Sequence, residues 1–267
     1  MLAASLTAVY GGLAPAGRRP ATAFQAKEKQ VPVLGIKVVK TFPHDPHAFT
    51  QGLEYYGGFL YESTGETGQS SVRKIELETG KVLQKTELSP ECFGEGLTIF
   101  QGKIYQLTWL TKVGFVYDLG TFRKLREFHF YGEGWGLAHD AKNLILSDGT
   151  NTLRYLDPET FVVVRKLEVY DGKQAVTNLN ELEYIDNDIY ANVWHANRIA
   201  RIDARSAKPS AWRLARATAT ARSERSTPRP LALGNSVSKA QSSAPNRAKD
   251  MVSAMGWNRR PDGPVST

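Results

Sequence analysis

The stretch that decides the fold is FGEGLTIFQGKIYQLT, residues 93–108. A residue held between two glycines precedes a leucine, and a turn at Gln101-Gly102 then separates two runs rich in aromatic and β-branched residues. The register of leucine and following strand occurs four times, although both glycines are present only at 94–96 and 134–136. The leucines stand 44, 40 and 45 residues apart, at Leu53, Leu97, Leu137 and Leu182. This spacing is typical of four-stranded propeller blades.

Strand chemistry separates this repeat from helical repeats of similar length. A second strand begins seven residues after each leucine, at Leu60, Ile104, Leu144 and Ile189. A third follows at 71–75, 114–117, 152–155 and 198–202. No segment of the sequence has the periodicity of a useful amphipathic helix. The sequence therefore predicts an all-β propeller whose first strands line a central channel.

One position of the repeat, two places before the leucine, holds four different residues: Gln51, Glu95, Trp135 and Asn180. A structural position would reuse one residue type, so we interpret the four as one composite site at the channel mouth. Glu95 is its only ionisable member, and a carboxylate in an aromatic-lined pocket suits proton transfer. The alternative for Glu95 is an ordinary solvated turn carboxylate.

Two tryptophans also share a position in the repeat. Trp109 and Trp194 each lie 12 residues after the leucine of their unit. Together with Trp135 they could form the wall of an apolar pocket. The alternative is packing between blades.

The charge of the chain is unevenly distributed. The net charge is +7, but residues 206–267 hold 11 Lys or Arg and 3 Asp or Glu, which leaves residues 1–205 almost neutral. No basic stripe crosses the repeats, so nucleic-acid binding is not expected. The single cysteine, Cys92, cannot form an intrachain disulfide.

The composition divides the chain into three parts. Residues 1–32 are predicted to be a disordered leader or a weak signal peptide, which would direct the protein to the periplasm or outside the cell; a cytoplasmic location is the alternative. Residues 33–205 form the predicted propeller, which breaks off in its fourth unit. Residues 206–267 are basic, poor in aromatics and predicted to be disordered or derived from a shifted reading frame. No stretch is long and apolar enough to cross a membrane.

No metal or cofactor is expected. His44 and His47 flank Asp45-Pro46 in a loop, and no further ligands gather near them in the sequence. No phosphate loop, dinucleotide fingerprint or serine nucleophile motif is present.

Four motifs in order resemble the plant and bacterial type of glutaminyl cyclase, the glutamine cyclotransferase family. They are residues 45–53, 93–97, 134–137 and 178–183, and the resemblance covers about residues 34–205. It implies a five-bladed propeller, a monomer, and cyclisation of an N-terminal glutamine to pyroglutamate with release of ammonia, without catalytic zinc.

The resemblance also implies roles for the site residues. Glu95 would carry the proton from the amine to the leaving ammonia. Gln51 and Asn180 would be polar groups near the peptide, with Asn180 bonded to the amide or its oxyanion. The pocket walls would be Phe49, Phe93, Trp109, Trp135 and Trp194.

The chain departs from the family pattern because four units are visible where five are expected. The strand 33–40 would close the ring with a last blade that is not seen in the sequence. We therefore predict that the chain as written is unstable or inactive. Two other functions remain open: a non-catalytic peptide-binding propeller, and a metal-dependent lactonase-like or quinoprotein-like propeller with Glu95, Asn180 and Asp148 as ligands.

Overall fold

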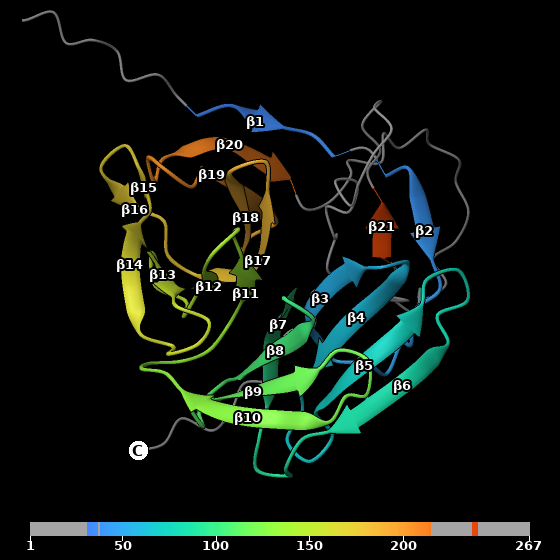
Figure 1. Cartoon of the computed structure of the whole chain (residues 1–267). Helices are drawn as coiled ribbons and strands as arrows, with labels where there is room; N and C mark the ends of the chain where they lie inside the picture. The colour runs from blue at the N-terminus through green and yellow to red at the C-terminus, as the bar shows by residue number, and fades with distance from the viewer. Residues whose placement is uncertain (1–30, 37, 215–236, 240–267) are drawn as a thin grey trace, which may run out of the picture. The chain divides into compact units, whose positions relative to one another are not determined.

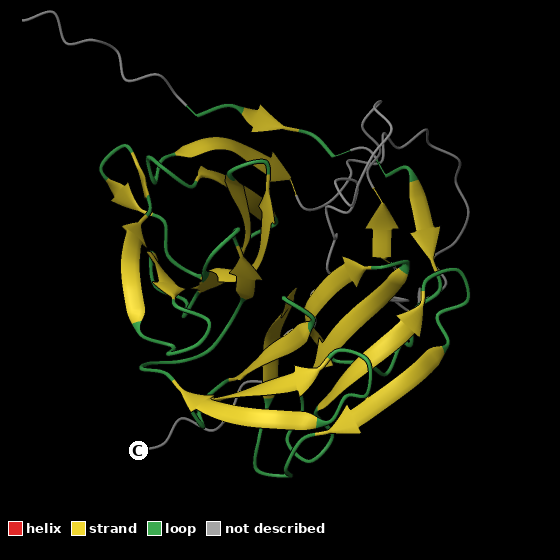
Figure 2. Cartoon of the chain, viewed as in Figure 1, coloured by secondary structure: helices red, strands yellow, loops and turns green. Residues whose placement is uncertain are grey.

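The computed structural model describes residues 31–36, 38–214 and 237–239 (Figure 1). Within these ranges every regular element is a β-strand, which confirms the predicted all-β class (Figure 2). None of these residues forms a helix that could span a membrane. The predicted leader, except its last two residues, and the predicted tail at 215–236 and 240–267 lie outside the described residues.

Four antiparallel sheets, the blades, follow one another along the chain. The first contains β3 (Thr50–Tyr56), β4 (Phe59–Thr64), β5 (Ser71–Glu76) and β6 (Val82–Glu87). The second contains β7 (Gly94–Phe100), β8 (Lys103–Thr108), β9 (Val113–Asp118) and β10 (Lys124–His129). The third contains β11 (Leu137–His139), β12 (Leu144–Leu146), β13 (Thr152–Leu156) and β14 (Val163–Glu168). The fourth contains β17 (Leu179–Ile185), β18 (Asp188–Val193), β19 (Arg198–Asp203) and β20 (Pro209–Leu214).

Five short strands complete the described chain. β1 (Val33–Leu34) pairs in parallel with β20, so the fourth sheet has five strands. β15 (Tyr170–Asp171) and β16 (Gln174–Ala175) form a hairpin after the third blade. β2 (Lys40–Phe42) pairs with β21 (Val237–Lys239).

The fourth blade continues beyond Arg205, where the sequence pattern places its end. β20 pairs with β19 and completes the blade, and Trp212 in it is only 6% exposed. The closing strand expected at 33–40 is shorter, and its partner is this fourth blade. β20 is hard to recognise in the sequence because alanine and proline are uncommon in strands. Its buried side chains include Ala211 and Trp212.

Apolar side chains fill the spaces between successive blades. Tyr61, Val72, Leu97, Ile104 and Phe115 lie between the first and second blades. Leu107, Phe128, Leu137, Leu146 and Phe161 lie between the second and third. Leu153, Tyr155, Leu182, Ile189 and Trp212 lie between the third and fourth. Burying each such side chain stabilises the fold by about 1.5–3 kcal/mol.

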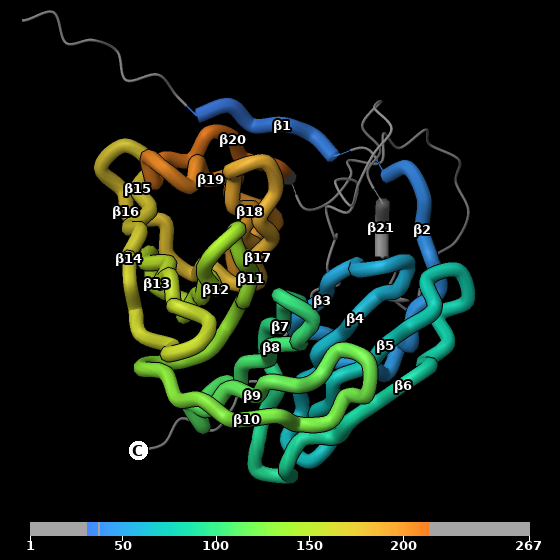
Figure 3. The backbone as a smooth tube through the Cα atoms, viewed as in Figure 1, coloured from blue at the N-terminus to red at the C-terminus, as the bar shows by residue number. Residues whose placement is uncertain are grey.

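This packing brings the first strands of the blades together. β3 contacts β7, β7 contacts β11, and β11 contacts β17. The backbone tube in Figure 3 follows the same four strands. The structure thus confirms the four blades of the predicted propeller, with the register leucine of each buried on its first strand.

Candidate functional site

Three of the four predicted site residues lie in β-bulges. Pairing with the neighbouring strand skips from Thr50 to Gly52 in the first blade, past Gln51. In the second blade it skips Glu95 and Gly96, and in the fourth it skips Asn180 and Glu181. A bulge bends the strand and redirects a side chain, and bulges are common beside active sites. The bulges thus leave Gln51, Glu95 and Asn180 outside the regular strand pairing.

Close backbone contacts set these bulges side by side. A Cβ on Gly52 would meet the backbone nitrogen of Leu97 at 2.5 Å, and one on Gly96 would meet that of Leu137 at 2.5 Å. A Cβ on Gly136 would collide with the backbone oxygen of Asn180. The Gly96 amide also donates to the Trp135 carbonyl at 2.7 Å. Only glycine allows blades to approach this closely.

The four predicted residues therefore come from adjacent strand starts in the order of the chain. Three of them, Gln51, Glu95 and Trp135, come directly before the contacting glycines. The fourth, Asn180, provides the backbone oxygen that lies against Gly136. The structure brings them together although they span more than a hundred residues of sequence. Their roles toward a peptide stay predictions.

Glu95 is completely buried, with 0% exposure. A buried chain of polar groups crosses three strands: Tyr117 on β9 donates to Gln106 on β8 at 3.1 Å, and Gln106 donates to Ser63 on β4 at 2.7 Å. The amide of Gly94 donates to the Ser70 hydroxyl at 2.9 Å. This burial excludes a solvated turn carboxylate.

The predicted aromatic residues form two rows. Phe49 and Phe93 meet edge to face at 5.9 Å between ring centroids, and Phe93 meets Trp109 at 5.8 Å. Trp135 and Trp194 meet edge to face at 5.4 Å. Four blades thus contribute to these two rows, which we together call the aromatic wall.

Sequence reasoning missed Glu181, the neighbour of Asn180. It stands where the first three repeats have Gly52, Gly96 and Gly136. The residue is 4% exposed, and its carboxylate accepts from the Leu53 amide of the first blade at 3.3 Å. Burial and the nearby Glu183 charge raise its pKa well above the usual range, although the Leu53 hydrogen bond opposes this.

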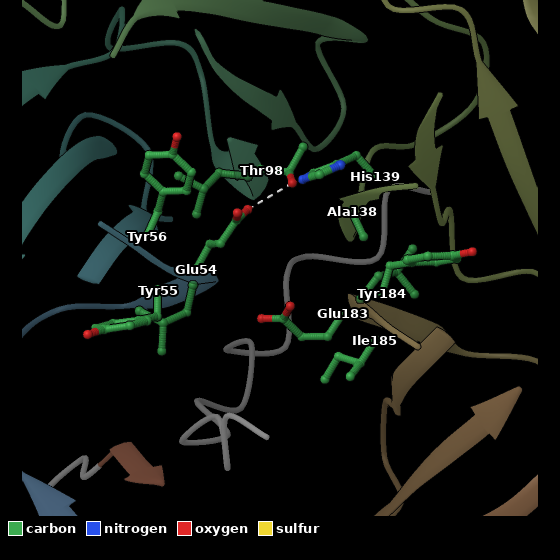
Figure 4. Close-up of a pocket in the computed structure, with 12 residues that line it drawn as sticks. Glu54, Tyr55, Tyr56, Thr98, Ala138, His139, Glu183, Tyr184 and Ile185 are labelled. Carbon is green, nitrogen blue, oxygen red and sulfur yellow. Dashed lines mark hydrogen bonds between the residues drawn. The ribbon is translucent and has the colours of Figure 1, made fainter. Parts of the chain in front are cut away.

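A second feature is a cavity of about 280 Å³ at the other end of the first strands (Figure 4). Glu54, Thr98, His139 and Glu183 bring polar side chains to it. Glu54 accepts from the Thr98 hydroxyl and the Ile99 amide, both at 2.8 Å. Leu53, Leu97 and Leu182 also line the cavity, so it extends back to residues just after the bulges.

The two cavity carboxyls have raised pKa values. Loss of hydration is the largest cause for both Glu54 and Glu183, and the charge of Glu54 adds to the shift of Glu183. The sequence contained a signal for this pair. Each stands directly after the register leucine, where the second and third repeats have Thr98 and Ala138.

Of the three ligands considered for a metal, Glu95 and Asn180 lie at bulges of the first strands. No group of three or more His, Cys, Asp or Glu side chains suited to a metal ion occurs within residues 31–36, 38–214 and 237–239. Asp148 instead pairs with Arg154 at 3.2 Å. His44 bonds to the buried Glu62 at 2.7 Å, which explains the conspicuous histidine loop as a structural contact.

The repeated blades agree with a comparison to known proteins. The sequence matches the glutamine cyclotransferase family model over residues 12–238. The chain belongs to this family. The four described blades therefore belong to the propeller fold of this family.

Two relatives illustrate the similarity. The glutaminyl-peptide cyclotransferase of Arabidopsis thaliana is 50% identical over 180 residues, which are 66% of this chain and 56% of that protein. The crystal structure of Myxococcus xanthus glutaminyl cyclase superposes with a TM-score of 0.65 at 32% identity, covering 69% of this chain and 78% of that one. The chain thus spans little more than half the length of the curated relative.

Another similarity concerns the fold alone. A Bacteroides caccae protein of unknown function superposes with a TM-score of 0.50 at 16% identity, over 62% of this chain and 66% of that one.

Proposed function

We propose that this chain binds peptides that begin with glutamine and cyclises that residue to pyroglutamate, with Glu95 as the proton carrier. The burial of Glu95 in the bulge of an innermost strand, beside the aromatic wall, carries this proposal. Membership of the glutamine cyclotransferase family and the named Arabidopsis relative support it.

The reaction is an intramolecular acyl transfer. The α-amine attacks the side-chain amide carbon, a C–N bond forms, and the bond to the amide nitrogen breaks. Glu95 accepts the amine proton and returns it to the leaving nitrogen, so ammonia departs and the carboxylate is restored. A pocket that folds the glutamine back on its own amine lowers the entropic part of the barrier.

The neighbouring residues have distinct tasks in this scheme. Asn180, at the bulge of β17, donates to the amide oxygen as negative charge develops on it. Gln51 offers a polar contact from the first blade. The aromatic wall encloses the apolar stem of the glutamine and excludes water.

The test is ammonia release from a glutamine-initiated peptide, compared between the full chain and Glu95→Gln. We expect the substitution to lower turnover about 100-fold or more while peptide affinity changes little, because the amide keeps the shape of the side chain but cannot act as the base. An unchanged rate would refute the role of Glu95. Binding without turnover in both proteins would instead favour the non-catalytic peptide-binding propeller.

The same assay measures whether the chain as written is active. Turnover by the full chain would support the proposed activity and contradict the expectation of inactivity drawn from the sequence pattern.

A further inference from the structure

Glu133 connects two tryptophans of the aromatic wall. Its Oε2 atom accepts from the Trp109 indole at 2.6 Å and from the Trp135 indole at 2.8 Å. These lengths match hydrogen bonds to a charged acceptor. An indole N–H can only donate, so a carboxylate, which can only accept when ionised, suits two indoles at once.

This contact joins the two rows of the wall. Phe49, Phe93 and Trp109 form the row from the first and second blades. Trp135 and Trp194 form the row from the third and fourth. Glu133 spans the boundary between them, and its carboxylate thereby fixes the orientation of both rings that meet there.

Glu133 is itself held in place. Arg154 donates from Nη2 to the Glu133 carbonyl at 3.4 Å and also bonds to the Tyr131 carbonyl. Arg154 is 7% exposed and pairs with Asp148 at 3.2 Å. The amide of Gly134 donates to the Trp109 carbonyl at 3.2 Å. The acceptor is therefore set before any peptide arrives, as a precise binding site requires.

We propose that Glu133 is a positioning residue of the peptide site, which clamps the indoles of Trp109 and Trp135 so that their faces are held toward the bound glutamine. The effect on peptide binding rests on the proposed function, whereas the clamp does not. With their N–H groups bonded to Glu133, the two rings offer the ligand flat apolar surfaces.

The chain contains a matched control. Trp212 donates its indole N–H to Asp171 at 3.0 Å, in the fourth blade and away from the bulges. Asp171→Ala removes the same kind of contact from a tryptophan outside the wall. Glu133→Gln keeps an acceptor oxygen but removes the charge.

The first measurement is the indole N–H resonances of the full chain, assigned with single Trp→Phe variants. Glu133→Ala should shift the Trp109 and Trp135 signals and leave Trp212 in place, Asp171→Ala should do the reverse, and Glu133→Gln should shift the wall signals less than alanine does. Unmoved Trp109 and Trp135 signals in Glu133→Ala would overturn the clamp. This measurement needs no activity.

The second measurement is the affinity of a glutamine-initiated peptide, read by fluorescence anisotropy in the Glu95→Gln background. Adding Glu133→Ala should weaken binding about tenfold, because two indoles lose their acceptor. Glu133→Gln should weaken it less, and Asp171→Ala should leave it unchanged. Equal losses from Glu133→Ala and Asp171→Ala would overturn the positioning role. No binding by the Glu95→Gln parent would count against the proposed function, while the resonances would still decide the clamp.

Discussion

Replacing Gly96 with alanine should destabilise the blades far more than its single added methyl suggests. The new Cβ would lie 2.5 Å from the Leu137 nitrogen and 2.7 Å from the Trp135 oxygen. Both are backbone atoms of the next blade, so no side-chain rotation can relieve the clash. The two first strands must therefore move apart.

The magnitude follows from two costs. Overpacking a tight site costs about 1–3 kcal/mol. Separating the strands also weakens the 2.7 Å hydrogen bond between the Gly96 amide and the Trp135 carbonyl, which contributes about 1 kcal/mol. The free energy of unfolding should fall by about 3 kcal/mol, or about 1–2 M in urea midpoint at a slope near 2 kcal/mol/M.

The control is Gly35→Ala, because a Cβ at Gly35 would meet nothing within 4 Å. Its free energy of unfolding should stay within about 0.5 kcal/mol of the parent's. Equal midpoints for Gly96→Ala and Gly35→Ala would refute the idea that backbone contact between blades sets the positions of Glu95 and Trp135.

Two further predictions concern pH. Burial opposes a charged His44, but its hydrogen bond to Glu62 and the Glu62 charge outweigh this and raise its pKa above 6.5. Protonated His44 therefore contributes its full stabilisation below pH 6.5, and this is lost as pH rises through the higher pKa of the folded state. Urea midpoints should fall above pH 6.5. His44→Gln should make that fall smaller. The raised pKa of Glu181 has the same sign: the folded state binds the extra proton above pH 4.5, so stability falls as pH rises from there. Glu181→Gln should reduce this slope and stabilise the chain at neutral pH, whereas the exposed Glu78→Gln should not, and a slope unchanged by Glu181→Gln would contradict the assignment.

The register of the repeat was the part of the fold that the sequence could predict. Leucines at constant places, turns between strands and glycines beside the slots all report local backbone geometry, which each unit repeats. The same register placed Gln51, Glu95, Trp135 and Asn180 at adjacent strand starts, as the structure has them. β20 was not predicted because proline, serine and alanine fill half of it and give little of the alternation typical of a strand.

Glu133 could not be predicted from the sequence, for a different reason. It belongs to no repeated position, and its meaning depends on two indoles that lie 26 residues apart in sequence, Trp109 and Trp135. Only the packing of the second blade against the third brings both N–H groups to one oxygen. A single sequence contains no signal for such a contact.

The exceptional residue at position 181 of the repeat is visible in the sequence, but the contact that Glu181 makes is not. The repeat has glycine at 52, 96 and 136 and glutamate at 181. The three glycines let one blade's backbone touch the next, and a side chain at the fourth place forbids that approach. The carboxylate of Glu181 instead reaches the Leu53 amide, so the fourth and first blades meet through a side chain. A buried carboxyl makes that contact sensitive to protonation, which no backbone contact between the other blades would be.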